Sequence, residues 1–546
     1  MKILLMNPAF NGTMQSASLY PSTLLTLGSM LGPQPRMNLG PVKGVEVAIE
    51  TILGVTPGHV AHTDESTTKA LTETLQTHKP DIVGMGVSEG NINSIIWTCK
   101  KLRELDPTLK ILVGGDFATL FPITTMKETG ADVLLRGEAD LSLRDLMAAL
   151  VSGGTGKSLL GIPGLLIRDE NSGEILSSYE SSEIPILRPD YLEKIEYDMA
   201  LLERSIGYAT DVGIVGSRGC GFGGCPFCSV NIKQKLRRIS DDRTIEILEQ
   251  LHAFASDSEK KLTVNMSDPA FGGTKKGLIG LLNKMRGRFD ASYLGVNLAV
   301  DQLLEQGEKG ERKPSLDIIH MLATAGINYV ELGVESFSDD LLKRIKCGRY
   351  TGEEASAVII ELANAGVKIT VDTILTDIYS TVNELRDHVK LMLRTILRAR
   401  EINPTCLYLS NPNPFVIPHP GTKYYAEVLA AHTEADWESG KITGKLSSDP
   451  DHPYYDLRVG VPDAISRAVK LDRISVVFDS VNFHDGPDQL IKAGLADHRL
   501  NWFCDQTMNV PDSVVLSFLL MKDRPINYIV KHYTEEKGAV ELPLLG

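Results

Sequence analysis

Short apolar runs alternate with amphipathic stretches along the first 150 residues of the chain. A short apolar run between polar or glycine-rich segments predicts a strand, and apolar positions three or four apart predict a helix. The predicted strands are Ile3–Met6, Val60–Asp64, Asp81–Val87, Ile111–Gly114 and Val133–Arg136. The predicted helices are Pro41–Leu53, Thr67–His78, Ile95–Leu105, Ile123–Thr129 and Leu141–Val151. This order predicts a doubly wound α/β domain over residues 1–152, with a parallel sheet and a ligand site beyond the carboxyl ends of its strands.

The pattern changes over residues 153–210, where glycines interrupt the alternation. The segments Gly164–Ile167 and Glu174–Ser177 flank a polar turn, which predicts a β-hairpin. A short helix is expected near Asp198–Arg204. We therefore interpret this stretch as a linker that contains a hairpin.

Strand and helix patterns alternate again from residue 211. The predicted strands are Val212–Val215, Leu262–Asn265, Tyr293–Leu298, Tyr329–Gly333, Lys368–Thr373 and Thr405–Leu409. Helical patterns between them include Thr244–Phe254, Ser315–Ala325 and Ala355–Ala365. Repeated units of this kind predict a parallel partial (β/α)6 barrel over residues 211–424. Residues 425–546 lose the alternation and are expected to form an α+β extension.

Composition and charge narrow the possible partners. The formal net charge is −14, and no basic stripe occurs along the chain. A nucleic-acid partner requires clustered positive charge, so none is expected. No run of about 18 apolar residues and no signal-peptide pattern is present, so we expect a cytoplasmic protein without a membrane span. Seven cysteines are too few for a disulfide scaffold in a chain of this length.

Three of those cysteines, Cys220, Cys225 and Cys228, crowd into the glycine-rich segment Ser217–Cys228 directly after a predicted strand. Thiolates are the usual ligands of iron–sulfur clusters, and three on a four-iron cluster would leave one iron open. The alternatives are a zinc site or three structural cysteines. Structural zinc usually takes four ligands, and no further Cys or His follows at that spacing. We therefore favour the cluster.

This segment resembles the cluster loop of the radical SAM superfamily in its Ser-Arg-Gly-Cys beginning and its Phe227-Cys228 end. The family pattern has three residues between the first two cysteines, whereas this chain has four. The resemblance implies that Cys220, Cys225 and Cys228 hold a 4Fe–4S cluster and that Phe227 lies near the cofactors. It also implies binding of S-adenosylmethionine, its cleavage to a 5′-deoxyadenosyl radical, and a flavodoxin- or ferredoxin-type electron donor.

Other segments of the predicted barrel are similar to the same family. Asp268 lies where the family places second-strand contacts to S-adenosylmethionine, and Asn297 on the third strand is a further candidate contact to this cofactor. Glu335-Ser336 matches a fourth-strand Gly-x-Glu-Ser segment. The alternative for Glu335 is that it caps the following helix. Asp372–Asp377 departs from the family's fifth-strand sequence, so no contact is carried over there.

The N-terminal region resembles the cobalamin-binding domain found in this family. The resemblance rests on a strand followed by Gly114-Gly115, on an Arg-Gly-Glu sequence that ends at Gly137-Glu138, and on Ser88 after the third strand. The alternative is that the glycines make a tight turn in a generic α/β domain. No Asp-x-His-x-x-Gly motif follows the first strand, which predicts that neither a histidine nor the cofactor's own base coordinates cobalt.

The combined resemblance implies a cobalamin-dependent enzyme acting on a small-molecule substrate. The favoured reaction is methylation of an unactivated carbon through methylcobalamin and the adenosyl radical. The first alternative keeps these cofactors for a cyclisation, ring contraction or oxidation. The second alternative is a cobalamin-binding sensor, against which the cluster loop argues, because a sensor needs no redox-active cluster. The resemblance also implies that residues 425–546 shape the substrate pocket, and the alternative is that the aromatic residues of this region fill a core. No catalytic residue can be named.

Overall fold

The computed structural model describes residues 1–8, 19–52, 64–88, 91–178, 184–207, 209, 211–230, 235–257, 262–289, 294–307, 310–403, 406–409, 416–447 and 453–459. The chain divides into two compact units. The first unit comprises Met1–Gly219, Lys233–Asp268 and Lys445–Asp456. The second unit comprises Cys220–Ile232, Pro269–Gly444 and Leu457–Gly546.

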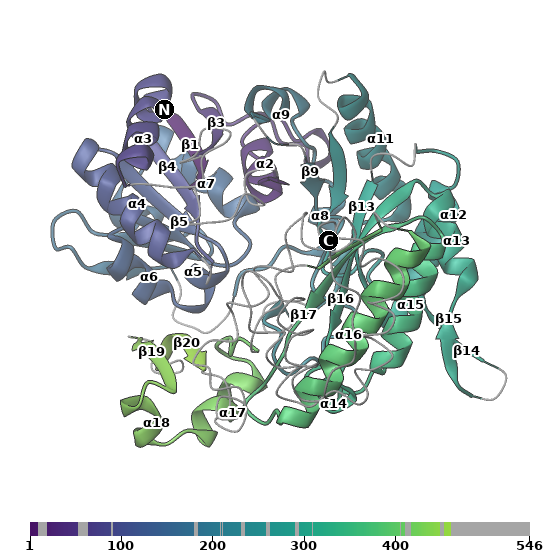
Figure 1. Cartoon of the computed structure of the whole chain (residues 1–546). Helices are drawn as coiled ribbons and strands as arrows, with labels where there is room; N and C mark the ends of the chain where they lie inside the picture. Colours follow the sequence, from purple (N-terminus) through teal and green to yellow (C-terminus); the bar gives the residue numbers. More distant parts are fainter. Residues whose placement is uncertain are drawn as a thin grey trace, which may run out of the picture. The chain divides into compact units, whose positions relative to one another are not determined.

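The N-terminal sheet lies in the first unit (Figure 1), with the strand order β3-β1-β4-β5-β6-β7-β8. Its strands are β1 (Lys2–Asn7), β3 (Glu46–Thr51), β4 (Ile82–Gly86), β5 (Lys110–Gly114), β6 (Val133–Leu135), β7 (Leu165–Arg168) and β8 (Ile175–Ser177). The first five are parallel, in the 2-1-3-4-5 order of a doubly wound fold. The central strand β1 buries Ile3–Met6 without interruption, as expected for a strand covered on both faces.

Five helices accompany this sheet. They are α3 (Asp64–His78), α4 (Ile92–Leu105), α5 (Asp116–Leu120), α6 (Pro122–Thr129) and α7 (Asp140–Val151). On α4, the buried side chains of Ile92, Ile95, Cys99 and Leu102 recur at helical spacing and form one apolar stripe. The doubly wound prediction for this domain is therefore confirmed.

Two predictions for the N-terminal region are wrong. Of the predicted helix Pro41–Leu53, residues 46–51 form the edge strand β3, which pairs in parallel with β1, and Leu53 lies outside the described residues. The sequence of β3 places the β-branched residues Val47, Ile49 and Thr51 at every second position, and the neighbour β1 supplies the pairing that decides against a helix. Of the predicted strand Val60–Asp64, residues 60–63 lie outside the described residues, and Asp64 instead begins α3.

The predicted hairpin is confirmed as β7 and β8, which pair in antiparallel fashion. Strand β7 also pairs with β6, so the hairpin extends the N-terminal sheet. The predicted helix near Asp198–Arg204 is α9 (Met199–Ser205).

A second group of parallel strands in the first unit consists of β2 (Leu19–Tyr20), β9 (Asp211–Ile214) and β12 (Thr263–Met266). Strand β2 was not predicted, because two residues are too short for a periodic signal. The other elements of this unit are α2 (Ser22–Ser29), η1 (Pro35–Met37), η2 (Gly156–Leu159), α8 (Pro189–Leu192), β10 (Ser217–Arg218), β11 (Arg237–Arg238) and α11 (Asp241–Asp257).

The second unit contains four neighbouring parallel strands, β13 (Leu294–Ala299), β16 (Ile327–Glu335), β17 (Lys368–Thr373) and β18 (Leu407–Leu409). Its helices include α12 (Lys275–Met285), α13 (Leu316–Thr324), α14 (Asp339–Lys346), α15 (Gly352–Asn364) and α16 (Val382–Ile402), with η3 (Val300–Leu303) and the antiparallel pair β14 (Leu304–Gln306) and β15 (Arg312–Pro314). Along β16, Val330, Leu332 and Val334 are buried and alternate with partly exposed residues. One face of this strand therefore belongs to the core and the other is free to line a site.

The chain continues through α17 (Lys423–Ala431), α18 (Glu434–Glu438), β19 (Ile442–Leu446) and β20 (Tyr454–Val459). These elements agree with an α+β extension up to residue 459, and the rest of the predicted extension lies outside the described residues. Within the part of the chain that the structure describes, no helix is long and apolar enough to cross a membrane.

Candidate functional site

The segment with the three cysteines is bracketed in sequence by a short two-stranded ribbon. Strands β10 and β11 pair in antiparallel fashion, with Ser217 opposite Arg238 and Arg218 opposite Arg237. We call this ribbon the neck (residues 217–218 and 237–238), and residues 220–228 the cysteine loop. The neck follows β9 directly, which confirms that the cysteines come after a strand of the parallel sheet.

The neck is tied to the N-terminal sheet by a buried group of four charges. Glu138 accepts hydrogen bonds from both terminal nitrogens of Arg237, at 2.6 and 2.9 Å. Arg218 forms a two-pronged pair with Asp140 at 2.7 and 2.9 Å and lies 3.3 Å from Glu138. In the structure, the carboxylate of Glu138 is therefore paired with two arginines, Arg218 and Arg237. Its predicted contact to a cofactor stays a prediction.

Asp268 holds the backbone at the entrance to the neck. Its buried carboxylate accepts hydrogen bonds from the amides of Gly216 and Ser217 at 2.6 and 2.8 Å. Burial raises the pKa of Asp268 to about 7, although these two hydrogen bonds favour the charged form. Asp268 therefore fixes the turn after β9, and its predicted contact to S-adenosylmethionine stays a prediction.

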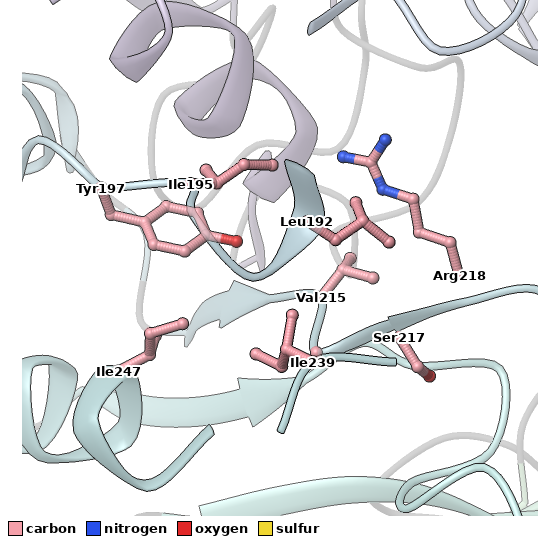
Figure 2. A pocket seen from close by; sticks show the side chains of 9 residues that line it. Leu192, Ile195, Tyr197, Val215, Ser217, Arg218, Ile239 and Ile247 are labelled. Carbon is pink, nitrogen blue, oxygen red and sulfur yellow. The ribbon is translucent and has the colours of Figure 1, made fainter. Parts of the chain in front are cut away.

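A small cavity lies behind the neck in the first unit (Figure 2). Its walls are the side chains of Leu192, Ile195, Tyr197, Val215, Ile239 and Ile247, with Ser217 and Arg218 at one side. The space available to the centre of a water molecule is about 10 Å³. A cavity of this size holds about one water molecule, so it is a packing gap and not a substrate site.

The three predicted cluster ligands are half-buried in the second unit. Burial raises the pKa of the Cys225 thiol to about 11 and also raises the pKa of Cys228, and the neighbouring thiolates add to both shifts. Three thiolates at this depth are therefore unfavourable unless a metal centre neutralises them. In the described part of the chain, no three His, Cys, Asp or Glu side chains lie close enough together to hold a single metal ion.

The backbone of the cysteine loop is closely held. A Cβ atom on Gly221 would lie 2.2 Å from the carbonyl oxygen of Gly273, so no larger residue fits at that position. The amide of Tyr424, in the first turn of α17, donates to the carbonyl of Pro226 at 3.1 Å. Phe227 is half-buried in the same loop. Three soft thiolate donors on a closely wrapped loop fit an iron–sulfur cluster.

Glu335 lies at the carboxyl end of β16 with a φ angle of 61°, which is uncommon for a residue other than glycine. Its carboxylate lies 2.9 Å from the ammonium of Lys346. Helix α14 is capped by Ser338, whose hydroxyl accepts from the amide of Leu341. The alternative in which Glu335 caps this helix is therefore wrong, and its contact to a ligand stays a prediction.

Ser336 is turned into the core. Its hydroxyl lies 2.9 Å from Nδ1 of His388, and the amide of Ser338 donates to it at 3.0 Å. Burial lowers the pKa of His388 to about 3, so this histidine stays neutral over the physiological range. Both contacts of the Ser336 hydroxyl are with groups of the protein itself. Its predicted contact to a cofactor stays a prediction.

The proximity of two carboxyl groups, Glu331 on β16 and Asp372 on β17, was missed from the sequence. Asn297, a predicted site residue on β13, lies opposite Glu331 on β16. Burial and the neighbouring carboxyl of Asp372 raise the pKa of Glu331 to about 7. Neither Glu331 nor Asp372 belongs to a local motif, so only the pairing of β16 with β17 brings the two together.

The predicted cobalamin contacts of the N-terminal domain lie at the carboxyl ends of their strands. Ser88 follows β4, Gly114 ends β5, Gly115 lies between β5 and α5, and Gly137 follows β6. Gly115 has a φ angle of 96°, and a Cβ atom there would lie 2.7 Å from the carbonyl oxygen of Val87. A Cβ atom on Gly137 would lie 2.3 Å from the carbonyl oxygen of Pro185. Close backbone packing thus accounts for both glycines, and their contact to cobalamin stays a prediction.

Comparison with known proteins adds the following. Residues 214–392 match the family model described as the Radical SAM superfamily. An uncharacterized methyltransferase, PH0819 of Pyrococcus horikoshii, is 26% identical over 196 residues, which are 35% of this chain and 40% of that protein. The chain thus spans less than half the length of this curated relative.

Two solved structures share the fold. One is the cobalamin-dependent S-adenosylmethionine radical enzyme OxsB with aqua-cobalamin bound, with a TM-score of 0.60 and 17% identity over 98% of this chain and 75% of that chain. The other is the radical S-adenosylmethionine methyltransferase TsrM of Kitasatospora setae with cobalamin and a [4Fe-4S] cluster bound, with a TM-score of 0.54 and 16% identity over 82% and 81% of the two chains. These likenesses confirm the predicted fold class.

Proposed function

Residues 214–392 place the chain in the radical SAM superfamily, and on that basis we propose that it is a cobalamin-dependent radical SAM enzyme that methylates a carbon of a small molecule. The observation that carries the proposal is the cysteine loop, which follows a parallel strand and presents Cys220, Cys225 and Cys228 from a closely wrapped backbone. A 4Fe–4S cluster on these thiolates and S-adenosylmethionine on its open iron would supply a 5′-deoxyadenosyl radical.

The described residues would divide the remaining tasks. Glu335 presents a carboxylate at a strand's carboxyl end, where it can accept hydrogen bonds from the ribose or the ammonium of S-adenosylmethionine. Phe227 and Asn297 would contribute to the same site. Asp268 would act through the backbone, because its carboxylate holds the amides of Gly216 and Ser217.

The assignment of cobalamin has separate support. The first five strands of the N-terminal sheet follow the order of a doubly wound fold, whose ligands bind beyond the carboxyl ends of the strands. Ser88, Gly115 and Gly137 lie at that edge. Both solved structures named above contain bound cobalamin and cover most of this chain. Cobalamin would supply a carrier for the transferred methyl group.

Removal of the cysteines tests the radical chemistry. After anaerobic reconstitution with iron and sulfide, the wild type should bind about four iron atoms per chain and form 5′-deoxyadenosine from S-adenosylmethionine and a reductant. The variant with Cys220, Cys225 and Cys228 all replaced by Ala should lose both properties and keep its far-ultraviolet circular dichroism. Cys347→Ala is the matched control and should keep the iron. Reductive cleavage by the triple variant would refute the assignment.

Methyl transfer is tested without knowledge of the substrate. The cobalamin-loaded protein is incubated with a reductant, which generates cobalt(I), and with S-adenosylmethionine that carries a deuterated methyl group. The mass of the extracted cobalamin is then measured by mass spectrometry. We expect methylcobalamin that carries the label. Formation of 5′-deoxyadenosine without any labelled methylcobalamin would favour the alternative, in which the same cofactors serve a cyclisation, ring contraction or oxidation.

A further inference from the structure

The segment Lys346–Tyr350 begins at the last residue of α14 and contacts the cysteine loop at two points within the second unit. The guanidinium carbon of Arg349 lies 4.1 Å from the ring centre of Phe222, a cation–π contact. The thiol of Cys347 donates to the carbonyl oxygen of Gly224 at 3.3 Å. Contacts of Cys347 and Arg349 therefore hold this segment, which begins at Lys346, against the cysteine loop.

Lys346 carries a buried positive charge at this place. Its side chain is only 10% exposed, and its ammonium lies 2.9 Å from Oε1 of Glu335. Burial disfavours the charged form, but Glu335, and after it Tyr350 and Cys225, keep the pKa of Lys346 above its ordinary value. A buried lysine without a partner would be strongly unfavourable, so the ion pair with Glu335 explains how the charge is tolerated.

The same charge acts on the cluster ligands. Burial has the largest effect on the thiols of Cys225 and Cys228 and raises their pKa values, whereas Lys346 lowers both. Glu335 acts in the opposite direction on Cys228. Because Cys347, which follows Lys346, contacts Gly224, which precedes Cys225, the ion pair of Lys346 and Glu335 lies next to the cysteine loop, and its two members carry opposite charges.

Neighbouring groups keep this ion pair in one place. The hydroxyl of Tyr350 donates to the carbonyls of Gly333 and Val334, at 3.1 and 2.8 Å, and so holds the end of β16 against the segment. Asp301 pairs with Arg349 and fixes its guanidinium. The two cations of this segment are thus each paired with a carboxylate, Lys346 with Glu335 and Arg349 with Asp301.

We propose that Lys346 is a positioning residue that holds a fixed positive charge beside the cluster cysteines, and that Glu335 balances this charge. The pair thereby sets how readily the cluster accepts an electron. A cluster gains negative charge when it is reduced, and a nearby buried cation stabilises the more negative form. The effect is large where the surroundings are dry, as they are around Lys346. The inference rests on the proposed cluster and adds to it the residues that control its potential.

The midpoint potential of the cluster tests this inference without any turnover. It is measured in the reconstituted full-length protein by redox titration followed by electron paramagnetic resonance, in the absence of S-adenosylmethionine. Lys346→Met should make the potential more negative, and Glu335→Gln should make it more positive. The double variant should return toward the wild type, and Lys346→Arg, which keeps the charge, should stay close to it.

Lys343→Met is the control, because Lys343 lies on the same helix but is 68% exposed and pairs with Asp340. It should leave the potential unchanged. Shifts of the same sign in Lys346→Met and Glu335→Gln, or no shift in either, would overturn the inference while leaving the cluster assignment intact. Should Lys346→Met fail to fold, the sign of the shift in the nearly isosteric Glu335→Gln still decides. A wild-type protein that takes up no iron would overturn the proposed function and this inference together.

Discussion

Replacement of Glu138 by Gln should open the neck of the cysteine loop locally. In the wild type, the carboxylate of Glu138 is 6% exposed and pairs with Arg237, which is 7% exposed. It also accepts a hydrogen bond from the amide of Leu187 at 2.5 Å and lies 3.3 Å from Arg218. The neutral amide keeps the shape of the side chain but leaves the charge of Arg237 without its partner.

The magnitude follows from the burial of this pair. Loss of one member of a buried ion pair costs about 3–5 kcal/mol, because the remaining charge stays desolvated. An amide oxygen still accepts one hydrogen bond, so we expect the lower end, about 3 kcal/mol. Each 1.4 kcal/mol is a factor of about ten, so the population of the open neck should rise roughly a hundredfold.

Hydrogen exchange is the suitable assay, because a chain with two compact units need not unfold in a single transition. The amide of Ile239, which donates to the carbonyl of Gly216 at 3.0 Å beside the neck, is the reporter. Its exchange should become about a hundredfold faster in Glu138→Gln. Glu170→Gln is the control, because Glu170 is 76% exposed in its pair with Lys110 and such pairs contribute at most about 1 kcal/mol.

A double variant separates the cost of an unpaired charge from other effects. Glu138→Gln combined with Arg237→Met removes both charges, so much of the lost protection should return. Exchange at Ile239 that is no faster in Glu138→Gln than in Glu170→Gln would refute the reasoning. Equal loss in the single and double variants would show that the unpaired charge is not the cause.

Four further outcomes are expected. Because Asp268 has a pKa raised from 3.8 to about 7, its contribution to stability is full below pH 4 and is lost as the pH rises to 7. This loss is worth up to about 4 kcal/mol and should appear as faster hydrogen exchange of the Ser217 amide across that range. Asp268→Asn should abolish the pH dependence. Ser336→Ala leaves Nδ1 of His388 without this partner and should destabilise the second unit by about 1–3 kcal/mol in denaturant titrations. Gly115→Ala should cost about 1–3 kcal/mol in the N-terminal domain, because the new Cβ atom meets Val87 in a strained conformation; thermal unfolding that is unchanged would contradict this reasoning. Electron paramagnetic resonance of bound cobalt(II) cobalamin should lack nitrogen superhyperfine splitting, and such splitting would contradict the absence of a nitrogen ligand.

The amino-acid sequence by itself determined most of the local structure. Runs such as Ile3–Met6 become central strands because a continuous apolar segment must be buried on both faces. The cysteine loop was also evident, because its ligands and glycines lie within a dozen residues. Periodicity failed at Pro41–Leu53, where pairing with β1 makes an edge strand from a segment that also fits a helix.

Only the tertiary structure decided which distant side chains meet. Glu138 and Arg237 are 99 residues apart in the chain, and nothing in either local sequence indicates the other. Lys346 likewise lies in a stretch of basic residues that includes the exposed Lys343, yet the fold buries it beside Glu335 and near the cysteine loop. Hydrophobic patterning acts over a few residues, whereas a buried charge is tolerated only where the completed fold supplies its partner. For that reason the ligands of the cluster could be predicted from the sequence, and the charges that surround them could not.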